Sequence, residues 1–298
     1  MVKRPHRPAE LTGQVFRGSA ARREGLLTAD HLRGPAWQKL FPDVYADAEL
    51  APTHLLKCRA AALILPPYAA ITGRSAACLD RLPLGEPNEP VQVLIPPDRR
   101  FQTQGIRVRR ARLPAGHLLP GTPTITVPQR TTWEIASEPD QVEAVVALDI
   151  LFHHKYLRPA AMDSWTKAHP RSRAAKTLAL ADGRAESPQE TRTRLQLAAA
   201  GLPTPVPQYK LWVNGRYVAR LDLAWPAAKV AAEYDGAHHA EIRQLIRDHD
   251  RSNKLLDAGW VVFHLTAAVL KDPVLFARFT TQLRAALSRT PQIAPRSG

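Results

Sequence analysis

The sequence contains few cysteines and no long apolar run. Among its 298 residues only Cys58 and Cys78 are cysteines. Two are too few for a structural zinc site, and we interpret both as small buried apolar residues rather than as a disulfide. No stretch approaches the roughly 18 apolar residues of a membrane-spanning helix, and Met1–Pro8 lacks the apolar segment of a secretory signal. These absences argue against membrane-spanning and secreted classes, so we expect a cytoplasmic protein.

Acidic residues are also scarce, because 27 Asp and Glu stand against 41 Lys and Arg and leave a net charge of +14. Both halves of the chain share this excess. A basic body around a local cluster of acids suits a polyanion such as DNA held near a metal. An arginine-rich composition on solvated faces explains the same total charge, and the sequence does not specify an oligomeric state.

Length and composition fit two domains. The apolar content of 45% and the 27 prolines indicate a globular chain whose short elements are joined by rigid turns. We predict a disordered basic arm over residues 1–12, an α+β region over 13–183, a second domain over 184–290 and a disordered tail over 291–298. The second domain is predicted to be α/β, a mixed sheet flanked by helices.

The N-terminal region begins with the parts of a winged helix-turn-helix. Short helices are predicted over Ser19–Gly25 and Thr28–Gly34, a further helical turn from Gly34 and an extended piece over Phe41–Tyr45. Any small helical bundle gives the same pattern. Farther along, periodicity predicts helices and strands. The helices are Thr53–Leu65, Thr72–Asp80, Thr131–Ser137, Val142–His153 and Ala174–Ala181, and the strands are Val91–Ile95, Ile106–Arg110 and Thr124–Val127.

The second domain opens with a complete helix-start signature, in which Ser187 caps, Pro188 takes the first turn and Glu190 follows three residues after the cap. Asn214-Gly215 between two β-rich runs is a strong hairpin signal. The predicted elements after the first helix are strands Val206–Val213, Arg216–Ala224, Lys229–Tyr234 and Trp260–Leu265 and helices Glu241–Ala258 and Pro273–Leu287. This order predicts the mixed sheet.

Acids and histidines gather around two of these strands. Asp222 ends the second hairpin strand, Glu233 and Asp235 alternate along the next strand, and His238 and His239 follow. A carboxylate in a buried strand needs a partner or a metal. Two such strands that hold their carboxylates side by side make a site for a hard divalent cation, Mg²⁺ or Mn²⁺, which leaves room for a water and a substrate phosphate. A histidine there has a pKa suited to proton transfer.

Further side chains have two interpretations each. Glu190 is either a third metal ligand from the preceding helix or only the partner of a helix cap. Four basic residues of the following helix either line a phosphate track or pair with the acids of the same helix. These four are Arg243, Arg247, Arg251 and Lys254.

Several short motifs in combination carry a resemblance. They are Glu186–Glu190, Gly201–Pro203, Leu221–Pro226, Glu233–Gly236, His238-His239, Arg247–Arg251 and Gly259-Trp260. Residues Ser187–Leu287 resemble the restriction-endonuclease-like (PD-(D/E)XK) superfamily, and within it the very-short-patch-repair (Vsr-like) endonuclease domains. The resemblance implies that Asp222 and Glu233 bind the metal and that Glu190 corresponds to the superfamily's helix acid. Asp235 stands where many members have a catalytic lysine, and Vsr-like enzymes use a nearby histidine, here His238 or His239.

The N-terminal region carries a looser resemblance. Phe16–Tyr45, Arg74–Leu79 and Pro128–Ala136 look like AbiEi-type antitoxins, which implies a winged helix followed by an α/β region and DNA binding by this part of the chain. Together the two resemblances imply a metal-dependent DNA endonuclease targeted by an N-terminal DNA-binding domain. The alternative is a DNA-binding regulator or antitoxin that retains the nuclease fold as an inactive scaffold, and a nuclease acting on RNA is a third reading.

Overall fold

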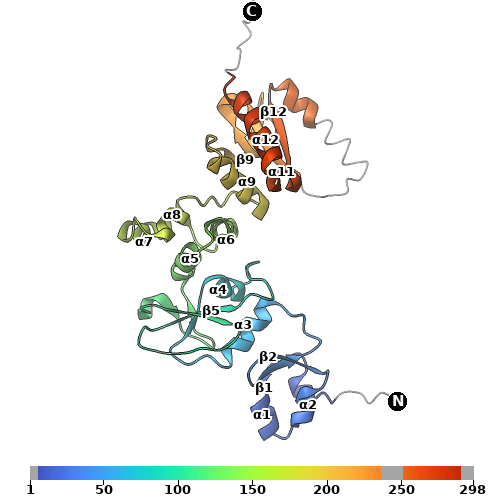
Figure 1. Cartoon of the computed structure of the whole chain (residues 1–298), viewed down its shortest axis with the longest axis vertical. Helices are drawn as coiled ribbons and strands as arrows, with labels where there is room; N and C mark the ends of the chain where they lie inside the picture. The colour runs from blue at the N-terminus through green and yellow to red at the C-terminus, as the bar shows by residue number, and fades with distance from the viewer. Residues whose placement is uncertain (1–5, 236–250, 290–298) are drawn as a thin grey trace, which may run out of the picture. The chain divides into compact units, whose positions relative to one another are not determined.

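The computed structural model describes residues 6–235 and 251–289 and divides the chain into two compact units, Met1–Ala179 and Leu180–Gly298 (Figure 1). The division lies shortly before the boundary at 183/184 that the sequence predicts. Both units combine helices with β-sheet, which confirms the α/β class. The predicted tail over 291–298 lies outside the described residues.

The N-terminal unit begins with a small antiparallel sheet. Its elements are η1 (Ala9–Leu11), β1 (Val15–Arg17), α1 (Gly18–Arg23), α2 (Ala29–Arg33), β2 (Trp37–Phe41) and β3 (Val44–Asp47). The strand order is β1-β3-β2. Thr28 caps α2 with its hydroxyl, as predicted.

Two expectations for this part are wrong. The segment after Gly34 does not continue as a helical turn but becomes β2, which pairs antiparallel with β3 and buries Trp37 and Phe41. Residues 6–12 are not a disordered arm: Leu11 is buried, and Arg7 forms an ion pair with Asp47. Burial of one leucine and pairing of one arginine are enough to fix this stretch.

The rest of the N-terminal unit surrounds a five-stranded sheet of order β6-β5-β4-β8-β7, in which β5 and β6 run parallel. The strands are β4 (Ala70–Ile71), β5 (Val91–Ile95), β6 (Ile106–Arg110), β7 (Leu118–Leu119) and β8 (Ile125–Thr126). The helices are α3 (His54–Ala62), α4 (Gly73–Leu79), η2 (Ala115–His117), α5 (Pro128–Ala136), α6 (Gln141–His153), η3 (Pro159–Met162), α7 (Asp163–Ala168) and α8 (Arg173–Leu178).

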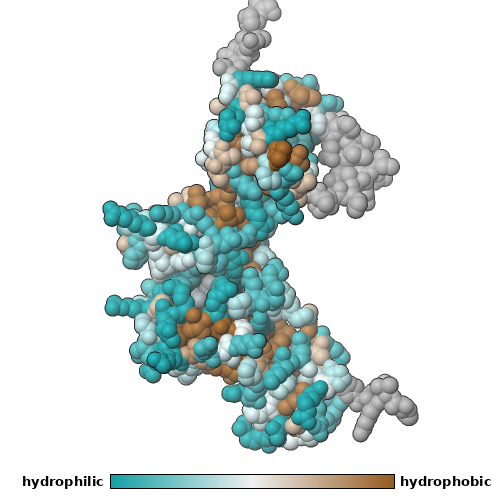
Figure 2. Space-filling model, viewed as in Figure 1, coloured by the Kyte–Doolittle hydropathy of each residue, from teal (hydrophilic) through white to brown (hydrophobic). Residues whose placement is uncertain are grey.

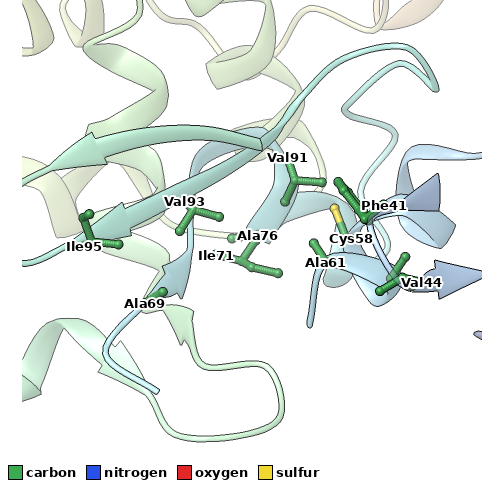
Figure 3. Packing of buried hydrophobic residues seen from close by; sticks show 11 residues of the cluster. Phe41, Val44, Cys58, Ala61, Ala69, Ile71, Ala76, Val91, Val93 and Ile95 are labelled. Atoms are coloured by element: carbon green, nitrogen blue, oxygen red, sulfur yellow. The ribbon is translucent and has the colours of Figure 1, made fainter. Parts of the chain in front are cut away.

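Alternate residues of β5 build the core of this unit. Val91, Val93 and Ile95 point toward Ile71 and Ala76 (Figure 3), because side chains two positions apart in a strand share a face. Both cysteines of the chain are buried and free, as predicted.

The C-terminal unit holds a mixed four-stranded sheet of order β12-β11-β10-β9, with β11 and β12 parallel and the other pairs antiparallel. Its strands are β9 (Val206–Val213), β10 (Arg216–Trp225), β11 (Val230–Asp235) and β12 (Val261–Thr266). Its helical elements are α9 (Pro188–Ala199), η4 (Pro226–Ala228), α11 (Ala267–Lys271) and α12 (Pro273–Leu287), and residues 251–257 are also helical.

Apolar side chains cover both faces of this sheet. On one face Leu223 of β10 packs in a cluster with Leu197 of α9 and Leu283 of α12. On the other face Ala224, the next residue of β10, belongs to a cluster with Leu255 and Trp260. Leu221 and Leu223 flank Asp222, so β10 runs through the centre of the unit and carries its carboxylate in a largely apolar setting.

In the described part of the chain, no helix is long and apolar enough to cross a bilayer. Hydrophilic residues cover much of the face seen in Figure 2.

Candidate functional site

The candidate site lies on β10 and β11 of the C-terminal unit, where two predicted acids meet. Leu223 of β10 is paired with Ala232 of β11, so Asp222 and Glu233 are the next residues along these two antiparallel strands. The carboxylate of Asp222 accepts a hydrogen bond from the backbone N–H of Tyr234, at 3.2 Å. The sheet therefore brings Asp222 next to β11, as the sequence predicts.

Glu190 reaches the same place from α9. Its carboxylate accepts hydrogen bonds from the Ser187 hydroxyl at 2.8 Å and from the Glu186 N–H at 3.0 Å. Ser187 Oγ in turn accepts a hydrogen bond from the Glu190 N–H at 3.2 Å. Glu190 thus takes part in the helix cap, but its side chain also faces the sheet, where it is buried.

Gln208 of β9 joins the two carboxylates. Its side-chain nitrogen lies 2.7 Å from Glu190 Oε2 and 3.4 Å from Asp222 Oδ1. It lies opposite Asp222, because Pro207 and Tyr209 on either side of it pair with the residues flanking Asp222. One amide therefore bridges an acid from a helix and an acid from a strand.

Two features make Gln208 unusual within β9. Its φ is +52°, in the left-handed region that a side chain other than glycine rarely adopts. Its amide oxygen is buried and has no hydrogen-bond partner in the described part of the chain. Sequence reasoning missed Gln208, since neither a left-handed residue inside a strand nor a cross-strand partner leaves a local pattern.

The environment makes Asp222 hard to ionise. Burial, together with the nearby carboxylates of Glu190 and Glu233, raises its pKa to about 6. The Tyr234 N–H and the Arg251 guanidinium act in the opposite direction. Close carboxylates in a poorly solvated place attract a cation or a proton.

Glu233 already has a cationic partner. The guanidinium of Arg251 binds both of its carboxylate oxygens, with Nη1 at 3.0 Å from Oε2, and Arg251 also donates to the Arg220 carbonyl at 3.0 Å. Glu233 is 7% exposed, so this pair satisfies a carboxylate that is almost fully buried. Arg251, predicted either to line a phosphate track or to pair with acids of its own helix, binds an acid of β11.

Asp235 lies apart from the other acids and is exposed. Its carboxylate contacts Nδ1 of His264 on β12, at 3.1 and 3.2 Å. His264 is the register partner of Glu233, because β11 and β12 run parallel. Sequence reasoning missed His264, since its place beside the acids depends on which strands become neighbours.

The remaining predicted residues divide into two groups. Lys254 is exposed in the helical residues 251–257. His238, His239, Arg243 and Arg247 lie outside the described residues.

The donors present suit a hard divalent cation in part. Glu190 and Asp222 offer carboxylate oxygens, and the amide oxygen of Gln208 lacks a partner among the described residues. Glu233 is bound to Arg251 instead, and in the described part of the chain no three His, Cys, Asp or Glu side chains form a metal-binding group. Glu190 and Asp222 are thus the carboxylates that suit such an ion, and the amide nitrogen of Gln208 bridges them.

The fold therefore defines an α/β unit in which the partly buried Asp222 of a central strand and the buried Glu190 of a helix share one hydrogen-bond donor. No family model matches the chain, and no solved structure matches it significantly. It is similar to two curated proteins of Mycobacterium tuberculosis, described as uncharacterized protein MT2308 (strain CDC 1551 / Oshkosh) and uncharacterized protein Rv2248 (strain ATCC 25618 / H37Rv). Each is 34% identical over 143 residues, 46% of this chain, and the match spans about half of each relative, 52%.

Proposed function

We propose that the protein is a metal-dependent DNA endonuclease that hydrolyses phosphodiester bonds through its C-terminal unit. The observation that carries the proposal is the carboxyl of Asp222, which lies within an apolar strand next to Glu190 and has a pKa raised to about 6 by burial. A partly buried acid among other acids is costly for folding, and such groups cluster at functional sites. The mixed sheet with helices on both faces agrees with the restriction-endonuclease-like resemblance.

In this proposal Glu190 and Asp222 hold a divalent cation, Mg²⁺ or Mn²⁺, while Gln208 sets the separation of the two carboxylates. The ion, when bound, lowers the pKa of a water and neutralises charge on the scissile phosphate. Asp235 orients the ring of His264 through Nδ1, so that Nε2 is the ring nitrogen proposed to exchange a proton with the substrate or a water. His238 and His239 keep their predicted roles as alternatives to His264.

DNA is proposed as the substrate because the chain is basic and because its first elements suit a DNA-binding module. Helices α1 and α2 followed by the hairpin of β2 and β3 agree with the winged-helix resemblance. The net charge of +14 favours a polyanion.

A second function has its own supporting observation. The guanidinium of Arg251 binds the carboxylate expected to be a second metal ligand, Glu233. An arginine side chain that occupies the carboxylate where a metal ion would bind suits an inactive nuclease fold. Such a fold would serve only as a scaffold in a DNA-binding regulator or antitoxin.

An assay for cleavage of supercoiled plasmid DNA with Mg²⁺ or Mn²⁺ distinguishes the nuclease from the DNA-binding regulator. We expect the wild-type chain to nick or linearise the plasmid and Asp222→Ala to lose at least about a hundredfold in rate, since the ion would lose one of its charged ligands. Asp257→Ala, which removes an exposed acid of the same unit, is the matched control and should cleave normally.

Equal cleavage by Asp222→Ala and the wild-type chain would exclude the proposed site. DNA binding without cleavage, unaffected by Asp222→Ala, would favour the regulator. Cleavage of labelled RNA but not of DNA would keep the chemistry and change the substrate.

A further inference from the structure

Arginines gather at one edge of the five-stranded sheet of the N-terminal unit. Strand β6 is the outermost strand of that sheet. Residues 97–112, which contain β6 and the loop before it, include six arginines and one acid, Asp98, and so carry a net charge of +5. We call these six the arginine edge, and all are exposed: Arg99, Arg100, Arg107, Arg109, Arg110 and Arg112.

The loop before β6 is fixed in place by its own contacts. The Tyr68 hydroxyl donates to the Arg100 carbonyl at 3.0 Å, and the Arg99 guanidinium lies 5.4 Å from the centre of the Tyr68 ring. Arg110 Nε donates to the Arg99 carbonyl at 3.3 Å, which ties the loop to β6. The arginine edge therefore projects from an ordered surface, which lowers the entropy lost on binding.

Between the loop and the end of β6 lies an open polar hollow of about 680 Å³. Arg100 and Arg110 lie on its lining together with Asp98 and Gln102. Its lining includes no cluster of large apolar side chains, the feature that marks the centre of most protein–protein interfaces. A charged, water-exposed ligand suits this hollow better than an apolar protein anchor.

Acids of the same unit neutralise only part of the arginine edge. Glu134 binds Arg109, and Asp98 lies 3.6 Å from Arg99. The guanidinium groups of Arg100, Arg107 and Arg112 have no hydrogen bond or ion pair within the described residues. One or two charges protect an edge strand from pairing with another chain, so this larger unbalanced set calls for a different explanation.

We propose that the arginine edge binds the phosphate backbone of duplex DNA. The planar guanidinium matches a phosphate with paired hydrogen bonds, and several close arginines release the counterions of several phosphates. Strand β6 pairs in parallel with β5 and does not form the two-stranded ribbon or helix that enters the major groove, so the contact holds DNA without reading its sequence. The inference takes DNA as the partner from the proposed function but rests on neither the carboxylates nor a metal.

The test compares two triple variants of the full chain that lose the same charge. R100Q/R107Q/R112Q removes the three arginines without an internal partner. R59Q/R81Q/R171Q removes three exposed arginines of the same unit that lie outside the arginine edge. Binding of a short fluorescent duplex is measured by anisotropy in EDTA, between about 50 and 200 mM salt.

Each lost phosphate contact should lower the slope of log affinity against log salt by about 0.9. Over this salt range the wild-type chain and the control variant should therefore lose roughly 40-fold more affinity than R100Q/R107Q/R112Q, for several unrelated duplex sequences alike. Should the triple variant melt early, each single variant should still lower the slope by about 0.9.

Equal slopes for both triple variants would overturn the inference while leaving the nuclease proposal intact. If R100Q/R107Q/R112Q lowers the salt-dependence slope but the wild-type chain never cleaves DNA, the result would support the arginine edge and count against the nuclease proposal. Binding to polyglutamate but not to the duplex would also overturn the inference, since the partner would then be an acidic protein segment.

Discussion

At the residue scale, Asp222 carries a charge that its surroundings disfavour, at the place where acids of the C-terminal unit converge. Asp222 lies between two fully or almost fully buried leucines of β10 and next to the carboxylate of Glu190. The amide of Gln208 and the N–H of Tyr234 are the hydrogen-bond donors to this carboxylate among the described residues. Two neutral donors only partly compensate for burial, which is why the pKa of Asp222 stays near 6.

This pKa predicts how stability depends on pH. The folded-state pKa of Asp222 is raised above the unfolded value of about 3.9, so its favourable contribution is complete below pH 4 and is lost as the pH rises through 6. We expect Asp222→Asn to match the wild-type chain near pH 4 and to exceed its free energy of unfolding above pH 7. The gain should be about 1–2 kcal/mol after allowance for solvent screening.

Urea unfolding at the two pH values measures this difference. Above pH 7, saturating Mg²⁺ should reduce the difference in free energy of unfolding between Asp222→Asn and the wild-type chain, because the ion stabilises only the wild-type chain. A lower stability of Asp222→Asn above pH 7 would contradict the raised pKa.

Gln208 allows a second prediction at this scale. Replacement by alanine and by glycine both remove the amide that bridges Glu190 and Asp222, but only glycine relaxes at a φ of +52°. Gln208→Gly should therefore be more stable than Gln208→Ala by about 1 kcal/mol in thermal or urea unfolding. Equal stabilities would show that the left-handed backbone at this position is not strained.

At the scale of elements, local sequence signals predicted most helices and strands. The predicted bounds of β5, β6, β9 and α12 agree with the structure, because alternation and helical periodicity are local properties. The hairpin turn is also confirmed, with positive φ at Asn214 and Gly215. The two-residue strands β4 and β7 and the short helix α11 were not predicted, since pairing with distant segments defines them.

The start of α9 gives a prediction for an element. Ser187→Ala removes the hydroxyl that caps the helix and holds Glu190, and should cost about 1 kcal/mol of stability in the C-terminal unit. Ser172→Ala removes the equivalent cap of α8 and should destabilise the N-terminal unit by a similar amount. Calorimetry of both variants provides the matched comparison, and an unchanged melting profile for Ser187→Ala would argue against the cap.

At the scale of the whole molecule, two compact units with separate cores predict two unfolding transitions. Leu221→Ala in the C-terminal unit and Ile71→Ala in the N-terminal unit each empty a fully buried site and should cost about 3 kcal/mol. Each variant should lower one calorimetric transition and leave the other in place. A single transition lowered by both variants would show that the units unfold together.

The sequence alone determined the class of each domain, most of its elements and the acids of the candidate site. Apolar periodicity, caps and turn residues act over a few neighbouring positions and can be recognised without a structure. Only the tertiary structure decided which polar side chains meet. The parallel pairing of β11 and β12 brings His264 next to Asp235. The register of β9 and β10 places Gln208 opposite Asp222. Arg251 forms an ion pair with Glu233. Such contacts join residues far apart in sequence, because burial of the sheet's apolar faces selects the strand order and the polar groups must then find their partners.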